Sequence, residues 1–310
     1  SWAPPAAPPS GANFSFTQTT VNGVVQTFFN YHFLKSSCGT TSDLFANAFK
    51  ITLIARNPCG ISQSSVTPIY INEAPQAAFN ASDTLICVGS SITFTSTTIA
   101  GQIITPAATG FGSTCTSTFN SFWNVSPNLG VSLLSGVYGF YPSITGSTAI
   151  TCQFNQPGTY TVRLITRNAC FQNDTALRVI CVVPQPVPAF VPSIKKGCAP
   201  LAINVQNNSG PASGCQPIQY KWRVQYLSNP PCAVGSNFSF TNSTDSTSLS
   251  PSLNFINPGR YVLLLLATNK CGTFVKRDTI TVKDKPQVSM PSNPNVCSAS
   301  QFITPTATVT

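Results

Sequence analysis

A block of about 40 residues occurs three times in this chain, and such a tandem repeat constrains the fold more than any single motif does. The copies begin at residues 49, 160 and 261 and read FKITLIARNPCGISQSSVTPIYINEAPQAAFNASDTLICVG, YTVRLITRNACFQNDTALRVICVVPQPVPAFVPSIKKGCAP and YVLLLLATNKCGTFVKRDTITVKDKPQVSMPSNPNVCSAS. The steps between the copies are 111 and 101 residues. The pentapeptide NFSFT, at 13–17 and again at 237–241, is a shorter fragment of the same repetition. The chain is therefore expected to be a row of domains of one type.

The period of the repeat predicts where the domains begin and end. Trp123 and Trp222 fall in step with the blocks, and Trp2 is the same landmark in an earlier, shortened copy. Each full period is long enough for a domain with its own hydrophobic core. The predicted division is 1–74, the C-terminal part of one domain; 75–184 and 185–285, two complete domains; and 286–310, the N-terminal strands of a further domain.

Each repeat is predicted to consist of short β-strands. Apolar Tyr160, Val162 and Leu164 alternate with polar Thr161 and Arg163, which places one face of a strand in a core and the other in water. A Pro-Gly turn precedes this strand in QPGTY (156–160) and in NPGRY (257–261). About seven short strands per hundred residues is typical of a β-sandwich. We expect an all-β fold of tandem, elongated sandwich domains with the following core landmarks: Trp2, Trp123, Trp222, Tyr160 and Tyr261.

The cysteine content predicts disulfides and an oxidising compartment. The chain has 12 Cys but a single His and no Cys-x-x-Cys pair, which favours disulfides over metal sites. Stable disulfides indicate an extracellular location. The opening SWAPPAAPPS holds neither an initiator Met nor a signal peptide, so an export signal is expected to be missing from this sequence. The apolar run 262–267 is too short to cross a bilayer, and no membrane insertion is expected.

The order of motifs within a repeat carries a family resemblance. PQAAF (75–79) and CVGSSITF (87–94) are followed by a central Trp, then by Pro-Gly-x-Tyr-x-Val and Asn-x-Cys. This order resembles the PKD (polycystic kidney disease) domain, and the cysteine-bearing form is similar to tandem PKD-like and Ig-like modules of giant surface adhesins of Bacteroidota, including gliding-motility-associated proteins. The resemblance covers essentially the whole chain. WNVSPNLG (123–130) and WRVQYLSN (222–229) replace the family's acidic Trp-Asp-Phe-Gly-Asp-Gly segment, so a calcium role is not expected there.

An Ig-like strand order implies a set of disulfides. In that order Cys115 precedes the Trp strand and Cys170 ends the Tyr strand, so both would lie at one end of a domain. The bridges predicted within domains are Cys115 with Cys170, Cys215 with Cys271, Cys87 with Cys152, and Cys198 with Cys232. A bridge between segments is predicted for Cys297 and Cys38. Cys59 and Cys181 have no predicted role.

The sequence offers little for catalysis or for nucleic-acid binding. Its seven acidic residues form no pair suited to acid–base hydrolysis, and the single histidine, His32, alternates with apolar residues in FNYHFLK. We therefore expect no enzyme activity, no cofactor and no metal. The net charge of +9 comes from scattered Lys and Arg, which does not indicate nucleic acid but favours weak attraction to acidic polysaccharide or anionic cell surfaces.

Four of the acidic residues share an Asp-Thr-apolar pattern or a close variant. The pattern resembles the O-glycosylation motif of exported Bacteroidota proteins. The acceptors that this resemblance implies are Thr84, Thr175, Thr279 and Ser246. The alternative is that Asp-Thr simply suits turns.

Two functions compete at this stage. The first is a structural repeat segment of an extracellular adhesin or filament, built from disulfide-stapled sandwiches stacked head to tail. The alternative is a carbohydrate-binding accessory module of a secreted multidomain enzyme. An exposed row of aromatic residues would favour the second, and the candidates for it are Phe119, Phe122, Tyr138, Phe140 and Tyr141.

The two partial domains at the ends predict self-association. The 25 residues of 286–310 and the 74 residues of 1–74 sum to 99, close to the 101-residue period. Either the chain is a window cut from a longer array, or the split domain is completed by the next copy, as in strand complementation of pilus subunits. Both versions predict that residues 286–310 pack against residues 1–74 of the next segment.

Overall fold

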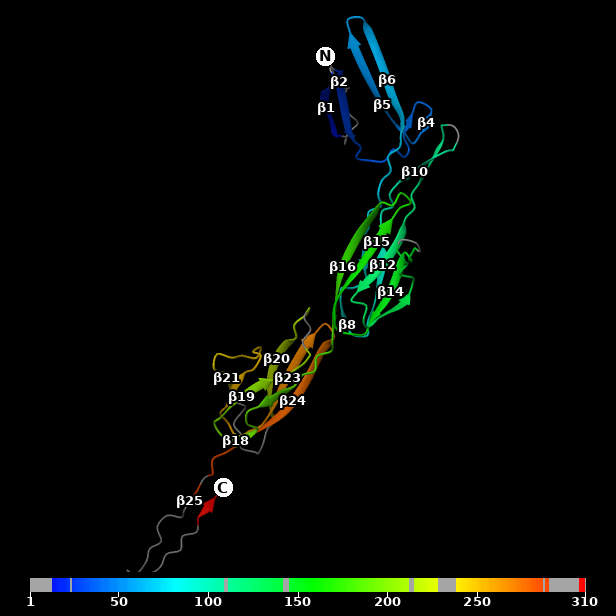
Figure 1. Ribbon diagram of the computed structural model, residues 1–310. Helices are drawn as coiled ribbons and strands as arrows, with labels where there is room; N and C mark the ends of the chain where they lie inside the picture. The colour runs from blue at the N-terminus through cyan, green and yellow to red at the C-terminus, as the bar shows by residue number, and fades with distance from the viewer. Residues whose placement is uncertain are drawn as a thin grey trace, which may run out of the picture. The chain divides into compact units, whose positions relative to one another are not determined.

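A computed structural model of the chain describes residues 13–22, 24–108, 111–141, 145–211, 215–227, 238–286, 288–289 and 307–309 (Figure 1). All regular secondary structure in these ranges is β-strand. The same ranges contain no helix that is long and apolar enough to span a membrane. The predicted all-β class is confirmed.

The first sandwich consists of two four-stranded sheets, with the strand orders β12-β15-β16-β8 and β13-β14-β9-β7. The strands are β7 (Phe79–Ala81), β8 (Leu85–Cys87), β9 (Ser91–Ser96), β12 (Asn120–Ser126), β13 (Val131–Ser135), β14 (Ala149–Phe154), β15 (Gly158–Arg167) and β16 (Asn173–Val183). β12 pairs antiparallel with β15, and the short β8 pairs parallel with the end of β16.

The second sandwich repeats this topology strand for strand. Its sheets have the orders β20-β23-β24-β18 and β21-β22-β19-β17. The strands are β17 (Phe190–Pro192), β18 (Lys196–Cys198), β19 (Leu201–Asn207), β20 (Gln219–Leu227), β21 (Phe238–Thr241), β22 (Ser252–Phe255), β23 (Gly259–Asn269) and β24 (Gly272–Lys283). The tandem Ig-like sandwich fold predicted from the repeat is confirmed.

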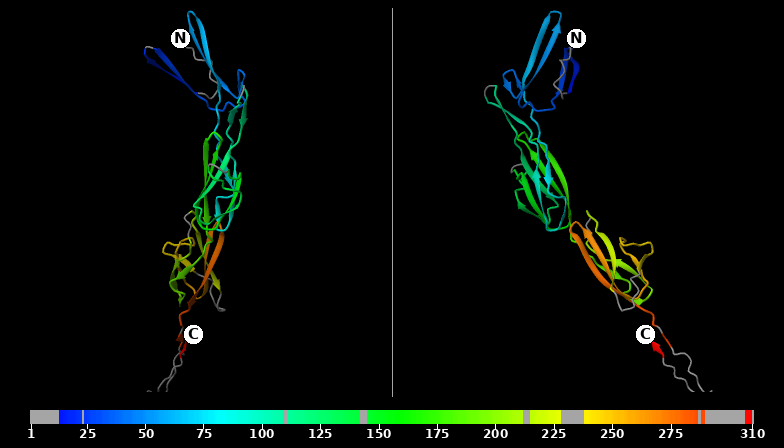
Figure 2. Two further views of the ribbon diagram at one scale, coloured as in Figure 1. Left: turned by 45° about the vertical axis from the view of Figure 1, so that its right-hand side comes forward. Right: turned by 180° about the vertical axis from the view of Figure 1, so that it is seen from behind.

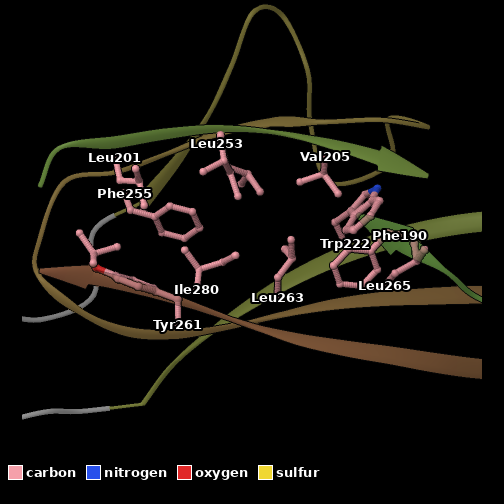
Figure 3. Close-up of a cluster of buried hydrophobic side chains, with 12 residues drawn as sticks. Phe190, Leu201, Val205, Trp222, Leu253, Phe255, Tyr261, Leu263, Leu265 and Ile280 are labelled. Atoms are coloured by element: carbon pink, nitrogen blue, oxygen red, sulfur yellow. The ribbon is translucent and has the colours of Figure 1, made fainter. Parts of the chain in front are cut away.

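Alternation along β23 builds the core of the second sandwich (Figure 3). Tyr261, Leu263 and Leu265 are fully buried, and the residues between them are only half-buried. Trp222 on β20 and Phe190 on β17 close one end of the cluster with their rings edge to face, 5.1 Å between centroids. Burial of Leu263 and of Leu265 stabilises the fold by about 1.5–3 kcal/mol each.

A tyrosine at the start of the long central strand fixes the corner of the second sandwich. The Tyr261 hydroxyl donates a hydrogen bond to the Asn257 carbonyl, 2.8 Å away and four residues upstream, which is the tyrosine corner of Ig-like domains. The preceding Pro-Gly turn needs its glycine, because Gly259 has φ +146° and a Cβ there would lie 2.4 Å from the Tyr226 ring.

Residues 13–74 form separate hairpins rather than a sandwich (Figures 1 and 2). The paired strands are β1 (Asn13–Val21) with β2 (Val24–His32), β3 (Thr41–Ser42) with β4 (Phe45–Ala46), and β5 (Phe49–Asn57) with β6 (Gly60–Ile69). Two further pairs are β10 (Ile103–Pro106) with β11 (Ser113–Thr116), and β25 (Val288–Ser289) with β26 (Thr308–Val309).

Residue contacts group the chain into two compact units. One contains residues 1–84, 89–155 and 160–180, and the other contains residues 85–88, 156–159 and 181–310. The division into four parts expected from the repeat stays a prediction.

Candidate functional site: cysteines and asparagines between the repeats

Three disulfides join described cysteines. They link Cys38 with Cys115, Cys87 with Cys271, and Cys181 with Cys215, at Cα separations of 5.9, 5.5 and 5.8 Å. Cys87 and Cys181 lie on β8 and β16 of the first sandwich, whereas Cys271 follows β23 and Cys215 precedes β20 of the second. These two bridges therefore join one repeat covalently to the next, and all four of their cysteines belong to the second compact unit.

Three of the predicted bridges are wrong: Cys115 with Cys170, Cys215 with Cys271, and Cys87 with Cys152. The prediction assumed that cysteines at one end of a domain pair with each other. Cys115 lies instead on β11, in a hairpin outside the sandwich sheets. Cys152 is fully buried on the inward face of β14 and forms no disulfide.

The predicted bridge between Cys38 and Cys297 is also wrong, because Cys38 is bonded to Cys115. Cys297, Cys232 and Trp2 lie outside the described residues. The bridge between Cys198 and Cys232 therefore stays a prediction. Cys181, which had no predicted role, is one of the cysteines that link the two sandwiches.

An asparagine two residues before the hairpin cysteine holds the chain that precedes each sandwich. Asn269 Nδ2 donates to the Pro184 carbonyl at 2.8 Å, and its Oδ1 accepts from the Cys271 amide at 2.8 Å. Asn168 Nδ2 donates to the Glu73 carbonyl at 3.4 Å. The Asn-x-Cys motif was visible in the sequence, but its bond to the preceding chain was not predicted.

The aromatic landmarks in the described residues lie in the cores. Trp123 and Trp222 are 4% and 1% exposed, and each indole Nε1 donates to a backbone carbonyl at 2.8 Å, of Ser147 and Ser248 respectively. The indole N–H thus has a partner in both copies, which a buried tryptophan requires. Tyr160 and Tyr261 are 2% and 0% exposed.

The predicted glycan acceptors share a local geometry. In three copies the aspartate Oδ1 accepts from the amide of the next threonine, at 2.7 Å for Thr84 and 2.8 Å for Thr175 and Thr279. Thr84 and Thr175 are exposed, whereas Thr279 and Ser246 are half-buried. This arrangement accommodates both alternatives, the turn and the modification, and glycosylation stays a prediction.

Titratable groups give no catalytic constellation in the described ranges. His32 is exposed, and no group of three or more His, Cys, Asp or Glu in these ranges could hold a metal ion. Hydrogen bonds from Thr247 and then Ser248 lower the pKa of Asp245. Burial raises the pKa of the Cys152 thiol, and burial with the 3.4 Å contact to Cys152 raises that of Tyr138.

The aromatic residues considered for carbohydrate binding do not share one environment. Phe140 and Tyr141 are 68% and 44% exposed, but Phe122 is 3% exposed and packs its ring against Tyr141. A depression on the second sandwich is lined partly by Asn204 and Asn242. Asn242 Nδ2 donates a hydrogen bond to the Ser252 hydroxyl, which donates in turn to Asn204 Oδ1. Neither feature presents the exposed aromatic row that the alternative function requires.

Comparisons with known proteins give only distant structural likenesses. No family model matches the chain, and no curated protein matches it. Among solved structures, the I67–I69 fragment of titin is 13% identical over 89% of each chain, with a TM-score of 0.38. The N-terminal eight Ig domains of DSCAM are 15% identical over 88% of this chain and 32% of theirs, with a TM-score of 0.45. FdeC, an adhesin of Escherichia coli, is 13% identical over 90% of this chain and 87% of its own, with a TM-score of 0.38. At these TM-scores and identities the likenesses carry no argument.

Proposed function

We propose that the chain is a structural repeat segment of an extracellular adhesin or filament, without catalytic activity. The observation that carries this proposal is the pair of disulfides, Cys87 with Cys271 and Cys181 with Cys215, that tie consecutive sandwiches together. Covalent links between domains suit a chain that must transmit force or hold its reach, and they persist in an oxidising, extracellular setting.

A second copy of the repeat is the partner that this role requires. Ile51 and Leu53 on β5 are 38% and 43% exposed. Their equivalents 111 residues later, Val162 and Leu164, are fully buried. Exposed positions whose equivalents form a core support the proposal that β5 and β6 belong to a sandwich completed by other strands.

Residues 286–310 of a neighbouring segment are the proposed source of those strands. Ser289 on β25 pairs with Thr308 on β26. β25 comes before β26 in the chain and pairs antiparallel with it. In the first sandwich β7 likewise comes before β9 and pairs antiparallel with it. Addition of such strands would cover the apolar face of the β5–β6 hairpin and remove its open edges.

Sedimentation of the purified chain over a range of concentrations tests this role. Association is expected to grow with concentration, and Leu53→Asp is expected to abolish it by placing a charge in the covered face. Ile61→Asp is the matched control, because Ile61 is 64% exposed and its equivalent, Gln172, is exposed too. A chain that stays monomeric at all concentrations, or equal loss in both variants, contradicts head-to-tail association.

The carbohydrate-binding alternative has its own outcome. Glycan-array binding by the isolated chain, abolished by substitution of Phe140 or Tyr141, would favour it over the structural role. We expect no such binding, because the other candidates are less exposed: Phe122 is buried, and Phe119 and Tyr138 are half-buried.

A further inference from the structure

The second sandwich carries an apolar stripe on the outer face of one of its sheets. Leu263 and Leu265 of β23 point into the core (Figure 3). The residues that alternate with them, Val262, Leu264 and Leu266, lie on the opposite face and are half-buried. An antiparallel strand with one face in a core ordinarily has polar residues on its other face. The core of this sandwich therefore does not account for the stripe.

Cationic side chains flank this stripe on both sides. Leu264 lies between Arg223 on β20 and Arg277 on β24. Leu266 lies opposite Lys221 on β20. Residues directly opposite each other in antiparallel strands project from the same face of the sheet, and these three cationic residues are exposed. Two strand spacings, about 10 Å, separate the two flanks.

No carboxylate of this sheet balances the flanking cations. Its four strands contain one acidic residue, Asp278 on β24. Asp278 lies opposite the buried Leu263, on the other side of the sheet, and pairs with Lys195 at 2.8 Å. The fold thus gathers on one face cations that are scattered in the sequence, and such a face attracts an anionic partner.

The matching face of the first sandwich lacks this arrangement. The equivalent of Leu264, 101 residues earlier, is Arg163, which lies opposite Asn124 on β12. A charge therefore stands where the second sandwich has the middle of its stripe. The stripe with its two cationic flanks belongs to one repeat and is not a requirement of the fold.

We propose that this face of the second sandwich binds an acidic amphipathic α-helix of another protein. A helix can cover a sheet face, and its diameter of about 10 Å fits between the two flanks. Its apolar residues lie on Val262, Leu264 and Leu266, and its Glu or Asp residues on either side reach the cations.

Other occupants match the face less well. A second copy of the chain does not complement it, because the chain has a net charge of +9 and its described residues form no helix. An acidic polysaccharide complements the cations but not the aliphatic stripe. The inference goes beyond the proposed structural role and does not depend on head-to-tail association.

A synthetic peptide tests the inference by fluorescence anisotropy with the full chain. The peptide has about 18 residues, with leucines at helical spacing on one face and glutamates on both sides of them. Saturable binding is expected at low salt, and it should weaken as salt is added. A peptide of the same composition, with its leucines spread around the helix, should bind about tenfold more weakly.

Variants of the chain assign the binding to this face. Leu264→Thr, and Arg223→Glu combined with Arg277→Glu, should each weaken binding about tenfold or more. Arg163→Glu is the matched control, because Arg163 is an exposed arginine on the equivalent strand of the first sandwich. Unchanged circular dichroism and urea midpoints serve as the fold control. The two arginines are exposed, so their variant keeps the test valid even where Leu264→Thr unfolds the sandwich.

Three results overturn the inference: equal binding of the two peptides, equal loss of binding in Arg163→Glu, or full binding by Leu264→Thr together with competition by a polyuronate. The last result would assign the face to acidic polysaccharide. Sedimentation of the same variants keeps this question apart from the proposed function. Peptide binding by a chain that stays monomeric would refute head-to-tail association and leave the binding face intact.

Discussion

Replacement of Gly101 by alanine tests whether residues 73–75 are fixed against the first sandwich by close backbone packing. A Cβ at Gly101 would lie 2.0 Å from the Glu73 carbonyl oxygen and 2.5 Å from the Ala74 carbonyl carbon. Both contacts are with backbone, which cannot swing aside as a flexible side chain can. The Glu73 amide donates to the Gln102 carbonyl at 2.8 Å, and the Gln102 amide donates back at 3.0 Å. The methyl group must therefore displace this paired backbone.

The expected cost follows from these contacts. Overpacking by one methyl costs about 1–3 kcal/mol, and loss of one of the two backbone hydrogen bonds by the displacement costs about 1 kcal/mol. We expect Gly101→Ala to lower the free energy of unfolding by about 2–4 kcal/mol. With a denaturant slope of about 2 kcal/mol/M in urea, the midpoint falls by about 1–2 M.

Urea unfolding with hydrogen exchange of the Glu73 and Gln102 amides measures the effect. Gly112→Ala is the control within the same unit, because its Cβ would meet only the Ala107 Cβ at 3.7 Å, an ordinary contact. That variant should change stability by less than about 1 kcal/mol. Equal midpoints for both variants, with the Glu73 amide still protected in Gly101→Ala, would refute the packing argument.

Two further predictions concern the cores of the sandwiches. Leu265→Ala should destabilise the second sandwich by about 2–5 kcal/mol in urea unfolding, because Leu265 is fully buried, whereas Leu249→Ala at a 63% exposed position should stay within about 0.5 kcal/mol. Cys152 and Tyr138 have raised pKa values in the fold, so their contribution to stability is complete below pH 9 and decreases as the pH rises above their ordinary values of 9.0 and 10.0. Alkylation at pH 8 should accordingly label Cys170 and spare Cys152 until the chain unfolds, and labelling of native Cys152 would contradict its burial.

Much of the fold could be predicted because each repeat carries the same local signals, an alternation of apolar and polar residues along its strands and a Pro-Gly turn. The buried face of β15, with Tyr160, Val162 and Leu164, is the apolar half of the alternation seen in the sequence. The Pro-Gly turn before β23 follows from the positive φ that only glycine adopts easily. Local rules of this kind act within one strand or turn, so a single sequence contains them.

Disulfide connectivity could not be predicted in the same way. A cysteine at the end of a sandwich can pair within its own domain or with a neighbour, and the spacing in sequence is the same in both cases. Cys271 lies 56 residues after Cys215 (271 − 215) but is bonded to Cys87, 184 residues away. The partner of Cys271 depends on which segment of the chain its hairpin faces. The hydrogen bond from Asn269 to the Pro184 carbonyl shows that this segment is the end of the preceding repeat.

Removal of each bridge between the sandwiches tests whether it acts mainly by restricting the unfolded chain. The sequence separations are 34 residues for Cys181 with Cys215 and 184 for Cys87 with Cys271. The chain-entropy model then gives about 4 kcal/mol for the shorter loop and about 5 kcal/mol for the longer. The four cysteines are half-buried and lie outside the core cluster of the second sandwich.

Paired Cys→Ser substitutions should therefore leave the far-ultraviolet circular dichroism of the native chain unchanged. In urea unfolding under oxidising conditions, loss of the Cys87 bridge should cost about 1.5 kcal/mol more than loss of the Cys181 bridge, because its loop is longer. The two double variants are controls for each other, since both remove two cysteines of similar exposure. If the shorter loop costs more, or if either variant loses β-structure before urea is added, the bridges act by holding native packing and the entropic account is wrong.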